Sequence, residues 1–246
     1  KSAIFAALLM TIIFFLINLI PQLSKKIYET PLKISCAVSN TAYFGIPISL
    51  ALLPPESFNT TIGFDLGSTL LTWTIGPFLL KTNDNSQVDI ILKNFFKIFS
   101  TPAIKGIFLY FLICLTPFKN YIYELIWLPS KLILLLSLSI VGMILSSAKY
   151  NFKNKQLWKY PKLPLIIKLL IMPFIAFLIS LFCGFNDYEI KALVIQSAGP
   201  SAISVLLISE AKKIKSFLLI NQILMSTLLS IFTIPFILVL LNIFLK

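Results

Sequence analysis

The stretch ISCAVSNTAYFGIPISLALL, residues 34–53, is apolar and long enough to cross a bilayer, yet its centre is polar and broken. A hydrocarbon core of about 30 Å needs about 20 helical residues. Asn40 and Thr41 place an amide and a hydroxyl in the middle of this length, and Gly45 and Pro47 follow them. Proline removes a backbone donor and clashes with the preceding helical turn. The pattern therefore predicts a membrane span that is interrupted at its centre.

The composition of the chain indicates an all-α polytopic membrane protein. Of 246 residues, 58% are hydrophobic and 12% are charged, which is too apolar for a soluble domain of this length. Backbone groups in lipid must be hydrogen-bonded within the protein, so the apolar runs predict a helical bundle. Eight spans are predicted, at about residues 2–20, 34–53, 60–80, 101–117, 125–148, 163–184, 190–209 and 216–245.

The charged residues indicate how these spans are oriented. The net charge of +12 comes from lysines, which lie mostly in short connections and form no basic domain, so nucleic acid is not an expected partner. Lysine-rich and lysine-poor connections alternate along the eight spans, which predicts that both ends of this chain lie outside. We expect an integral protein of a bacterial inner (plasma) membrane. The segment 88–100 could lie along the cytoplasmic interface or form a solvated loop.

A second predicted span, residues 190–210, has the same defect as the first. Its centre runs from Gln196 to Ser201 and contains Gly199 and Pro200. The residue before a proline is restricted to extended conformations, and proline suits the first position of a helix, so a half-helix is predicted to begin at Pro47 and another at Pro200. The amides and carbonyls freed by each break must face a protein-lined or watery cavity. Simple proline kinks are the alternative, and Pro77, Pro173 and Pro235 are read as such kinks.

The two interrupted spans lie in corresponding places. Each is flanked by one apolar span on either side, and the two triplets insert with opposite orientation, as an inverted-repeat transporter requires. The second repeat would then hold five spans and the first only three, so we expect eight of ten spans to be present and two to be missing at the amino end. The predicted domains are residues 1–81 for the first repeat, 82–150 for the interfacial loop and two scaffold helices, and 151–246 for the second repeat.

Three motifs resemble the auxin efflux carrier family, which includes plant auxin exporters and bacterial permeases for malate- or malonate-like anions. SNTAYFGIPISLAL at 39–52 and LVIQSAGPSAISVLLISE at 193–210 look like its two crossovers, and MSTLLSIFTIP at 225–235 is similar to its last-helix pattern. The resemblance implies inverted repeats with two crossed, broken helices, at 34–53 and 190–210, and an elevator-like motion. It also implies a homodimer, unless the two scaffold helices are truly absent.

The polar groups of the two breaks are the candidate substrate site. Half-helix amino ends attract anions, and amides and hydroxyls can donate to a carboxylate. The predicted substrate-binding residues are Asn40, Thr41, Gly45, Pro47, Gln196, Ser197, Gly199, Pro200 and Ser201, with Ser39 and Ser204 completing the lining. Asp65 inside the third span is either an ion-coupling group or an interfacial acid. Lys168 is expected to extend its ammonium to the cytoplasmic interface.

A secondary active transporter for a small organic carboxylate is the leading functional hypothesis, with membrane lipid and the anion as partners. A proton or sodium gradient is the expected energy source, and no cofactor or metal is expected. The chain has no histidine, catalytic triad, metal cluster or phosphate loop, which argues against an enzyme. A cation antiporter or a sodium-coupled bile-acid-type carrier is the second hypothesis, although a central acidic pair is lacking. A non-transporting membrane sensor or scaffold is the third.

Overall fold

The described part of the chain is a bundle of helices. The computed structural model describes residues 1–80, 102–126, 162–214 and 216–245, with isolated positions at 129, 132, 136, 139 and 143. The predicted interfacial segment at 88–100, most of the predicted span at 125–148 and both domain boundaries lie outside these residues. The helices are α1 Ser2–Leu19, α2 Pro21–Lys26, α3 Thr30–Ala37, η1 Thr41–Gly45, α4 Ile46–Leu52, η2 Pro55–Ser57, α5 Phe58–Leu79, α7 Pro102–Cys114, α9 Lys162–Ile166, η3 Ile167–Ile171, α10 Met172–Phe182, α11 Asp187–Ala198, α12 Ile203–Ala211 and α13 Phe217–Phe244.

Three helices among the described residues are long and apolar enough to cross a membrane. They are Ser2–Leu19, the continuous run Lys162–Phe182 and Phe217–Phe244. Large apolar side chains on their outer faces are exposed, including Leu19, Phe182 and Phe244. These exposed faces suit lipid, because lipid tails are as apolar as the side chains that face them. The predicted spans 2–20, 163–184 and 216–245 are confirmed as helices of membrane-spanning length.

Of the remaining predicted spans that the structure describes, two are broken into separate helices and two match continuous helices. The apolar length at 34–53 is divided into α3, η1 and α4, and that at 190–210 is divided into α11 and α12. Pro77 lies inside the continuous helix α5, which matches the run predicted at 60–80, and α7 covers most of the run at 101–117. Each half of a broken span is too short to cross a bilayer alone. The described helices thus agree with an all-α membrane protein.

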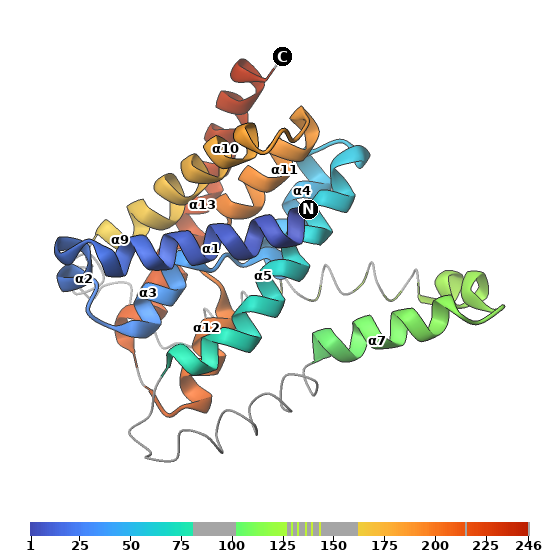
Figure 1. Ribbon diagram of the computed structural model, residues 1–246, viewed down its shortest axis with the longest axis horizontal. Helices are drawn as coiled ribbons and strands as arrows, with labels where there is room; N and C mark the ends of the chain where they lie inside the picture. The colour runs from blue at the N-terminus through green and yellow to red at the C-terminus, as the bar shows by residue number, and fades with distance from the viewer. Residues whose placement is uncertain are drawn as a thin grey trace.

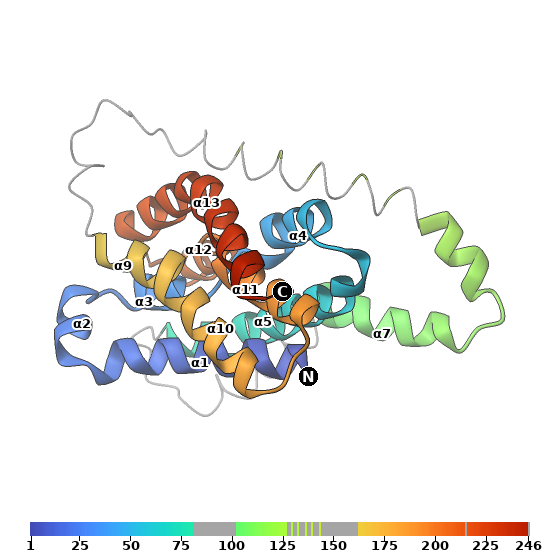
Figure 2. The same ribbon diagram turned by 90° about the horizontal axis from the view of Figure 1, so that it is seen from above.

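Small residues bring α1 and α5 into close contact. The two helices lie side by side in Figures 1 and 2. Gly63 faces the Ser2 side chain, and a Cβ atom on Gly67 would lie 2.7 Å from the backbone Cα of Ala3. Glycines four residues apart let membrane helices approach closely enough for backbone packing. The sequence Gly63–Gly67 is such a pair, and it fixes α5 beside α1.

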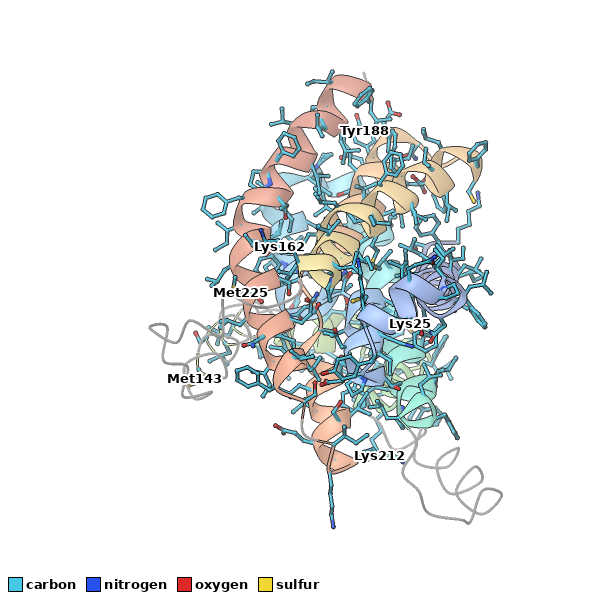
Figure 3. All side chains as sticks on the ribbon, turned by 90° about the vertical axis from the view of Figure 1, so that its left-hand side faces the viewer. Lys25, Met143, Lys162, Tyr188, Lys212 and Met225 are labelled. Carbon is cyan, nitrogen blue, oxygen red and sulfur yellow. The ribbon has the colours of Figure 1, made fainter. Side chains whose placement is uncertain are left out.

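Helix α11 forms the centre of the bundle. It contacts α5, α10 and α13, and every residue from Ala192 to Ala198 is buried. Its first turn is capped reciprocally, because Asn186 accepts from the Glu189 amide and Glu189 accepts from the Asn186 amide. Figure 3 shows Tyr188, near the beginning of α11, at one end of the bundle and Lys212, just after α12, at the other. The broken pair α11 and α12 therefore extends through the whole bundle.

Substitution of Gly67 by alanine should destabilise the fold. The added Cβ would overlap the α1 backbone, which cannot move away as a flexible side chain could. We expect the free energy of unfolding to fall by about 1–3 kcal/mol, measured as a lower melting temperature of the purified protein in detergent.

Gly106→Ala is the matched control, because no atom would lie within 4 Å of its Cβ. Equal melting temperatures for the two variants would contradict the proposed backbone contact between α1 and α5.

Candidate functional site

The two broken spans cross and pair through their backbones. After α3 ends at Ala37 and α11 ends at Ala198, the chain is extended at Val38–Asn40 and again at Gly199–Ala202. The Asn40 amide donates to the Pro200 carbonyl at 2.7 Å, and the Ala202 amide donates to the Val38 carbonyl at 3.1 Å. Ser39 and Ser201 lie opposite each other in this antiparallel pair. The crossing thus satisfies backbone groups that the breaks release.

Gly199 lies where α11 ends and the second extended segment begins. A Cβ atom on this residue would lie 3.2 Å from the Gln196 carbonyl oxygen and 3.7 Å from the Asn40 carbonyl oxygen. The first of these distances is tighter than ordinary van der Waals contact, whereas the second is an ordinary contact. A side chain here would therefore press on the end of its own helix rather than on the first extended segment.

The predicted start at Pro200 is wrong, and the predicted start at Pro47 lies one residue after the first residue of α4, although a π-helix precedes it. The second half of the first span begins at Thr41 as a π-helix, and Pro47 lies within the α-helix that follows. In the second span Pro200 remains in the extended segment, and α12 begins at Ile203. The physical reason is the pairing itself, because the Asn40 amide and the Pro200 carbonyl bond to each other across the crossing, which keeps both residues out of a helix. The π turn Thr41–Gly45 then absorbs the change of register before the proline.

A cavity of about 260 Å³ opens beside the crossing. Its polar wall is made by residues of the first extended segment, the start of η1, helix α5 and the start of α12: Ser39, Asn40, Thr41, Ser68, Thr69, Thr72 and Ser204. Apolar side chains, including Trp73 and Leu207, complete it. The cavity therefore brings hydroxyl groups and one amide into a lining that is otherwise apolar.

Two helix amino ends meet at this cavity. Residues Ala42 and Tyr43 of η1, and Ile203 and Ser204 of α12, all line it. The first amides of a helix have no acceptor in their own helix, and the helix dipole gives that end partial positive charge. The cavity therefore combines two sets of free donors from the two broken spans.

Asn40 has the most informative side chain in the cavity wall. It is 4% exposed, yet its amide makes no side-chain hydrogen bond within the described part of the chain. Its backbone is fixed on both sides, since its N–H donates to Pro200 and its carbonyl accepts from the Gly45 amide at 3.0 Å. The Asn40 side chain lines the cavity and bonds to no other side chain within the described residues, so its amide is available for a ligand.

Asp65 is tied to the first broken span. The Thr41 hydroxyl donates to the Asp65 carboxylate at 2.6 Å, and both side chains come from the membrane-spanning part of the chain. On α5, Asp65 lies between Thr61 and Thr69, which line separate cavities. The contact with Thr41 places Asp65 beside the crossing, and its role as an ion-coupling group stays a prediction.

The predicted residues of the second span lie on the other side of the crossing. Gln196 is fully buried and donates to the Ser49 hydroxyl at 3.2 Å, and a Cβ atom on Gly45 would overlap its side chain. The hydroxyl of Ser197 donates back to the Val194 carbonyl in its own helix. Of the nine residues predicted to bind substrate, the cavity is lined by Asn40 and Thr41, and not by Gly45, Pro47, Gln196, Ser197, Gly199, Pro200 or Ser201.

Ser201 joins the second extended segment to α3 and to α13. Its hydroxyl donates to the Ser35 carbonyl at 2.9 Å and accepts from the Gln222 amide at 3.2 Å, while its N–H donates to the Ser226 hydroxyl at 3.0 Å. Gln222 and Ser226 belong to α13. Ser226, the first serine of the MSTLLS motif, therefore stabilises the crossing by accepting a hydrogen bond from it. The position of Ser226 in the sequence does not by itself reveal this contact.

Lys168 corrects the expectation drawn from its position near a span end. The side chain is completely buried and does not reach the interface. Its ammonium donates to the Ser39 hydroxyl at 2.5 Å and to the Ser197 carbonyl at 2.9 Å. The helix that carries Lys168 packs against the crossing. The number of residues between Lys168 and the end of its span therefore does not tell how deeply its side chain is buried in the protein. The only sequence signal was a lysine in an apolar run.

The similarity of the chain to a known protein agrees with a membrane location. It is 25% identical over 202 residues to an uncharacterized transporter of Methanocaldococcus jannaschii, in a match that covers 80% of this chain and 63% of that protein. This chain is an integral membrane protein. It spans less than two thirds of the length of the curated relative it matches. No family model matches the chain, and no solved structure matches it.

Removal of the Ser201 hydroxyl should weaken the crossing. Ser201→Ala deletes the bond to the Ser35 carbonyl and the acceptor of the Gln222 amide, inside a buried region. We expect a loss of about 1–3 kcal/mol of stability, seen as a lower melting temperature in detergent.

Ser180→Ala is the matched control. Ser180 is equally buried, but its hydroxyl donates within its own helix to Phe177. If Ser201→Ala were no more destabilising than this control, the hydroxyl would not support the crossing.

Proposed function

We propose that this protein is a secondary active transporter that moves a small organic carboxylate by alternating access at the crossing. The observation that carries the proposal is the Asn40 amide, which is buried, without a side-chain partner among the described residues, and placed where two helix amino ends meet. Free amides and positive helix ends favour an anion, and a carboxylate accepts hydrogen bonds from both. The similarity to a protein named as a transporter supports the general class.

The arrangement also supports an inverted-repeat carrier of the auxin efflux type. The helix order α1, broken span, α5 is matched by the order α9–α10, broken span, α13. The two breaks pair in antiparallel fashion around Ser39 and Ser201, which suits two repeats of opposite orientation. In this proposal residues 1–81 and 151–246 carry the two transporting halves and 82–150 carries scaffold helices.

Asp65 is the proposed ion-coupling group. Its side-chain partners are Thr41 of the first broken span and Thr69 of its own helix, and no ion pair to it exists within the described residues. A carboxylate inside a membrane span is costly, and such groups commonly face a cavity and mark an ion or substrate pathway. Other charged groups and tyrosines on or next to elements that contact α5 form no hydrogen bond or ion pair with it: Lys1, Tyr43, Glu56, Lys105, Tyr110, Asp187, Tyr188, Glu189, Lys191 and Glu210.

Carboxylate uptake into proteoliposomes tests the proposal directly. We expect the purified protein to take up at least one of radiolabelled malate, malonate and indole-3-acetate. Asn40→Ala should lower the initial rate at low substrate concentration by about tenfold or more, because a hydrogen bond to a charged group is lost. Asn18→Ala is the control, since the Asn18 amide is exposed and bonds to Phe14.

The outcomes separate the functional classes. Binding of these acids without uptake would favour a sensor or scaffold, and sodium or proton exchange without carboxylate flux would favour a cation antiporter. Carboxylate uptake that is equal in Asn40→Ala and the unaltered protein would overturn the site assignment.

Substitution of Asp65 tests the coupling role. Asp65→Asn keeps the size and the acceptor for Thr41 but cannot gain or lose a proton or carry charge. We expect an imposed proton or sodium gradient to accelerate carboxylate uptake by the unaltered protein and to have no effect on the variant.

Asp187→Asn provides the control, because Asp187 is an exposed acid in the first turn of α11. An Asp65→Asn carrier that still responds to the same gradient would exclude Asp65 as the coupling group.

A further inference from the structure

Lys168 lies in the most polar contact between the two broken spans. It belongs to the π turn Ile167–Ile171 within the continuous helical run that precedes the second broken span. Its ammonium donates to the Ser39 hydroxyl of the first span and to the Ser197 carbonyl of the second, and it lies 3.1 Å from the Met172 sulfur. One side chain thus contacts both halves of the crossing.

The environment of the ammonium explains how a charge is accommodated there. The side chain is 0% exposed, and no carboxylate bonds to it within the described residues. A buried charge costs several kcal/mol unless its donors are satisfied. Ser197 is close to the carboxyl end of α11, where the helix dipole is negative and carbonyls lack donors. The ammonium therefore lies where the break in the second span favours a cation.

The contact also reaches the cavity through Ser39. This residue lines the cavity, accepts from Lys168 and donates to the Ser197 carbonyl at 3.1 Å. Two positions further along, Thr41 donates to Asp65. The segment Ser39, Asn40, Thr41 is therefore held by an ammonium at one end and a carboxylate at the other, with the free Asn40 amide between them.

We propose that Lys168 is a positioning residue for anion binding. Its ammonium ties the end of α11 to Ser39, which holds the cavity-facing segment in place, and it contributes positive charge one hydrogen bond behind the cavity wall. The effect on anions rests on the proposed transport function, whereas the tie between the two spans does not. The sign of the charge suits a carboxylate and opposes a cation in the cavity.

The tie can be tested without transport by labelling Cys36. This thiol is completely buried in α3, and its sulfur lies 3.8 Å from the Pro164 carbonyl oxygen, whereas Cys114 and Cys183 are exposed. In a Cys114→Ser, Cys183→Ser background, N-ethylmaleimide should label Cys36 at least about tenfold faster after Lys168→Met, because opening of the crossing exposes α3. Lys33→Met is the control, since its ammonium bonds to Asn18 and Ser24 away from the crossing.

A milder variant keeps the test possible if Lys168→Met does not fold. Ser39→Ala removes one partner of the ammonium and should also accelerate labelling. Adding Lys168→Met to it should give less than the product of the two separate effects, because both remove the same contact. Labelling rates that match the control in both single variants would overturn the tie.

The anion effect is tested in the carrier itself. With whichever of malate, malonate and indole-3-acetate the protein transports, Lys168→Met should raise KM by about tenfold, because a buried positive charge near the site is lost. Lys168→Arg should recover part of this rise, which a purely steric role would not predict. An unchanged KM in Lys168→Met would overturn the electrostatic role. An absence of all carboxylate flux would contradict the transport function. In that case the labelling of Cys36 would still decide whether Lys168 ties the two spans together.

Discussion

The hydrogen bonds between the Asn40 amide and the Pro200 carbonyl, and between the Ala202 amide and the Val38 carbonyl, are the contacts on which the rest of the structure depends. A helix broken inside a membrane releases amides and carbonyls that lipid cannot satisfy. Here each break supplies partners for the other, so neither span is stable in its broken form without its counterpart. The helices around them hold this pairing together: α13 through Gln222 and Ser226, and the run before the second break through Lys168.

The crossing has two faces with different chemistry. On one face, the starts of η1 and α12 open onto the cavity, with the Asn40 amide and the Ser204 residue in its wall. On the other face, Gln196 and Ser201 are fully buried and bonded to Ser49 and Ser35. On the first face the Asn40 amide makes no side-chain hydrogen bond within the described residues, whereas the Gln196 amide and the Ser201 hydroxyl on the second face stabilise the packing. This division explains how similar polar residues at two matched breaks can have different roles.

A basic and an acidic side chain lie at the two ends of the first extended segment. Lys168 and Asp65 contact residues 39 and 41 of the same extended segment from different helices. The lysine is fully buried against carbonyl and hydroxyl oxygens, and the acid is bonded to a hydroxyl. Neither side chain forms an ion pair within the described residues, so both are held there by hydroxyl and carbonyl groups.

The sequence by itself determined the class of the protein and the location of both breaks, because apolar length, proline, glycine and amide side chains act locally on a helix. It predicted α1, the run before the second break, and α13 well, since uninterrupted apolar runs have one stable form in lipid. It could not give the π-helix that begins at Thr41 or the start of α12 at Ile203, because the pairing of Asn40 with Pro200 keeps Pro200 out of a helix. Nor could it divide the polar residues between the cavity and the packing, or reveal that Lys168 is buried, because those facts depend on which face of each helix meets its neighbour. Only the tertiary structure decided them.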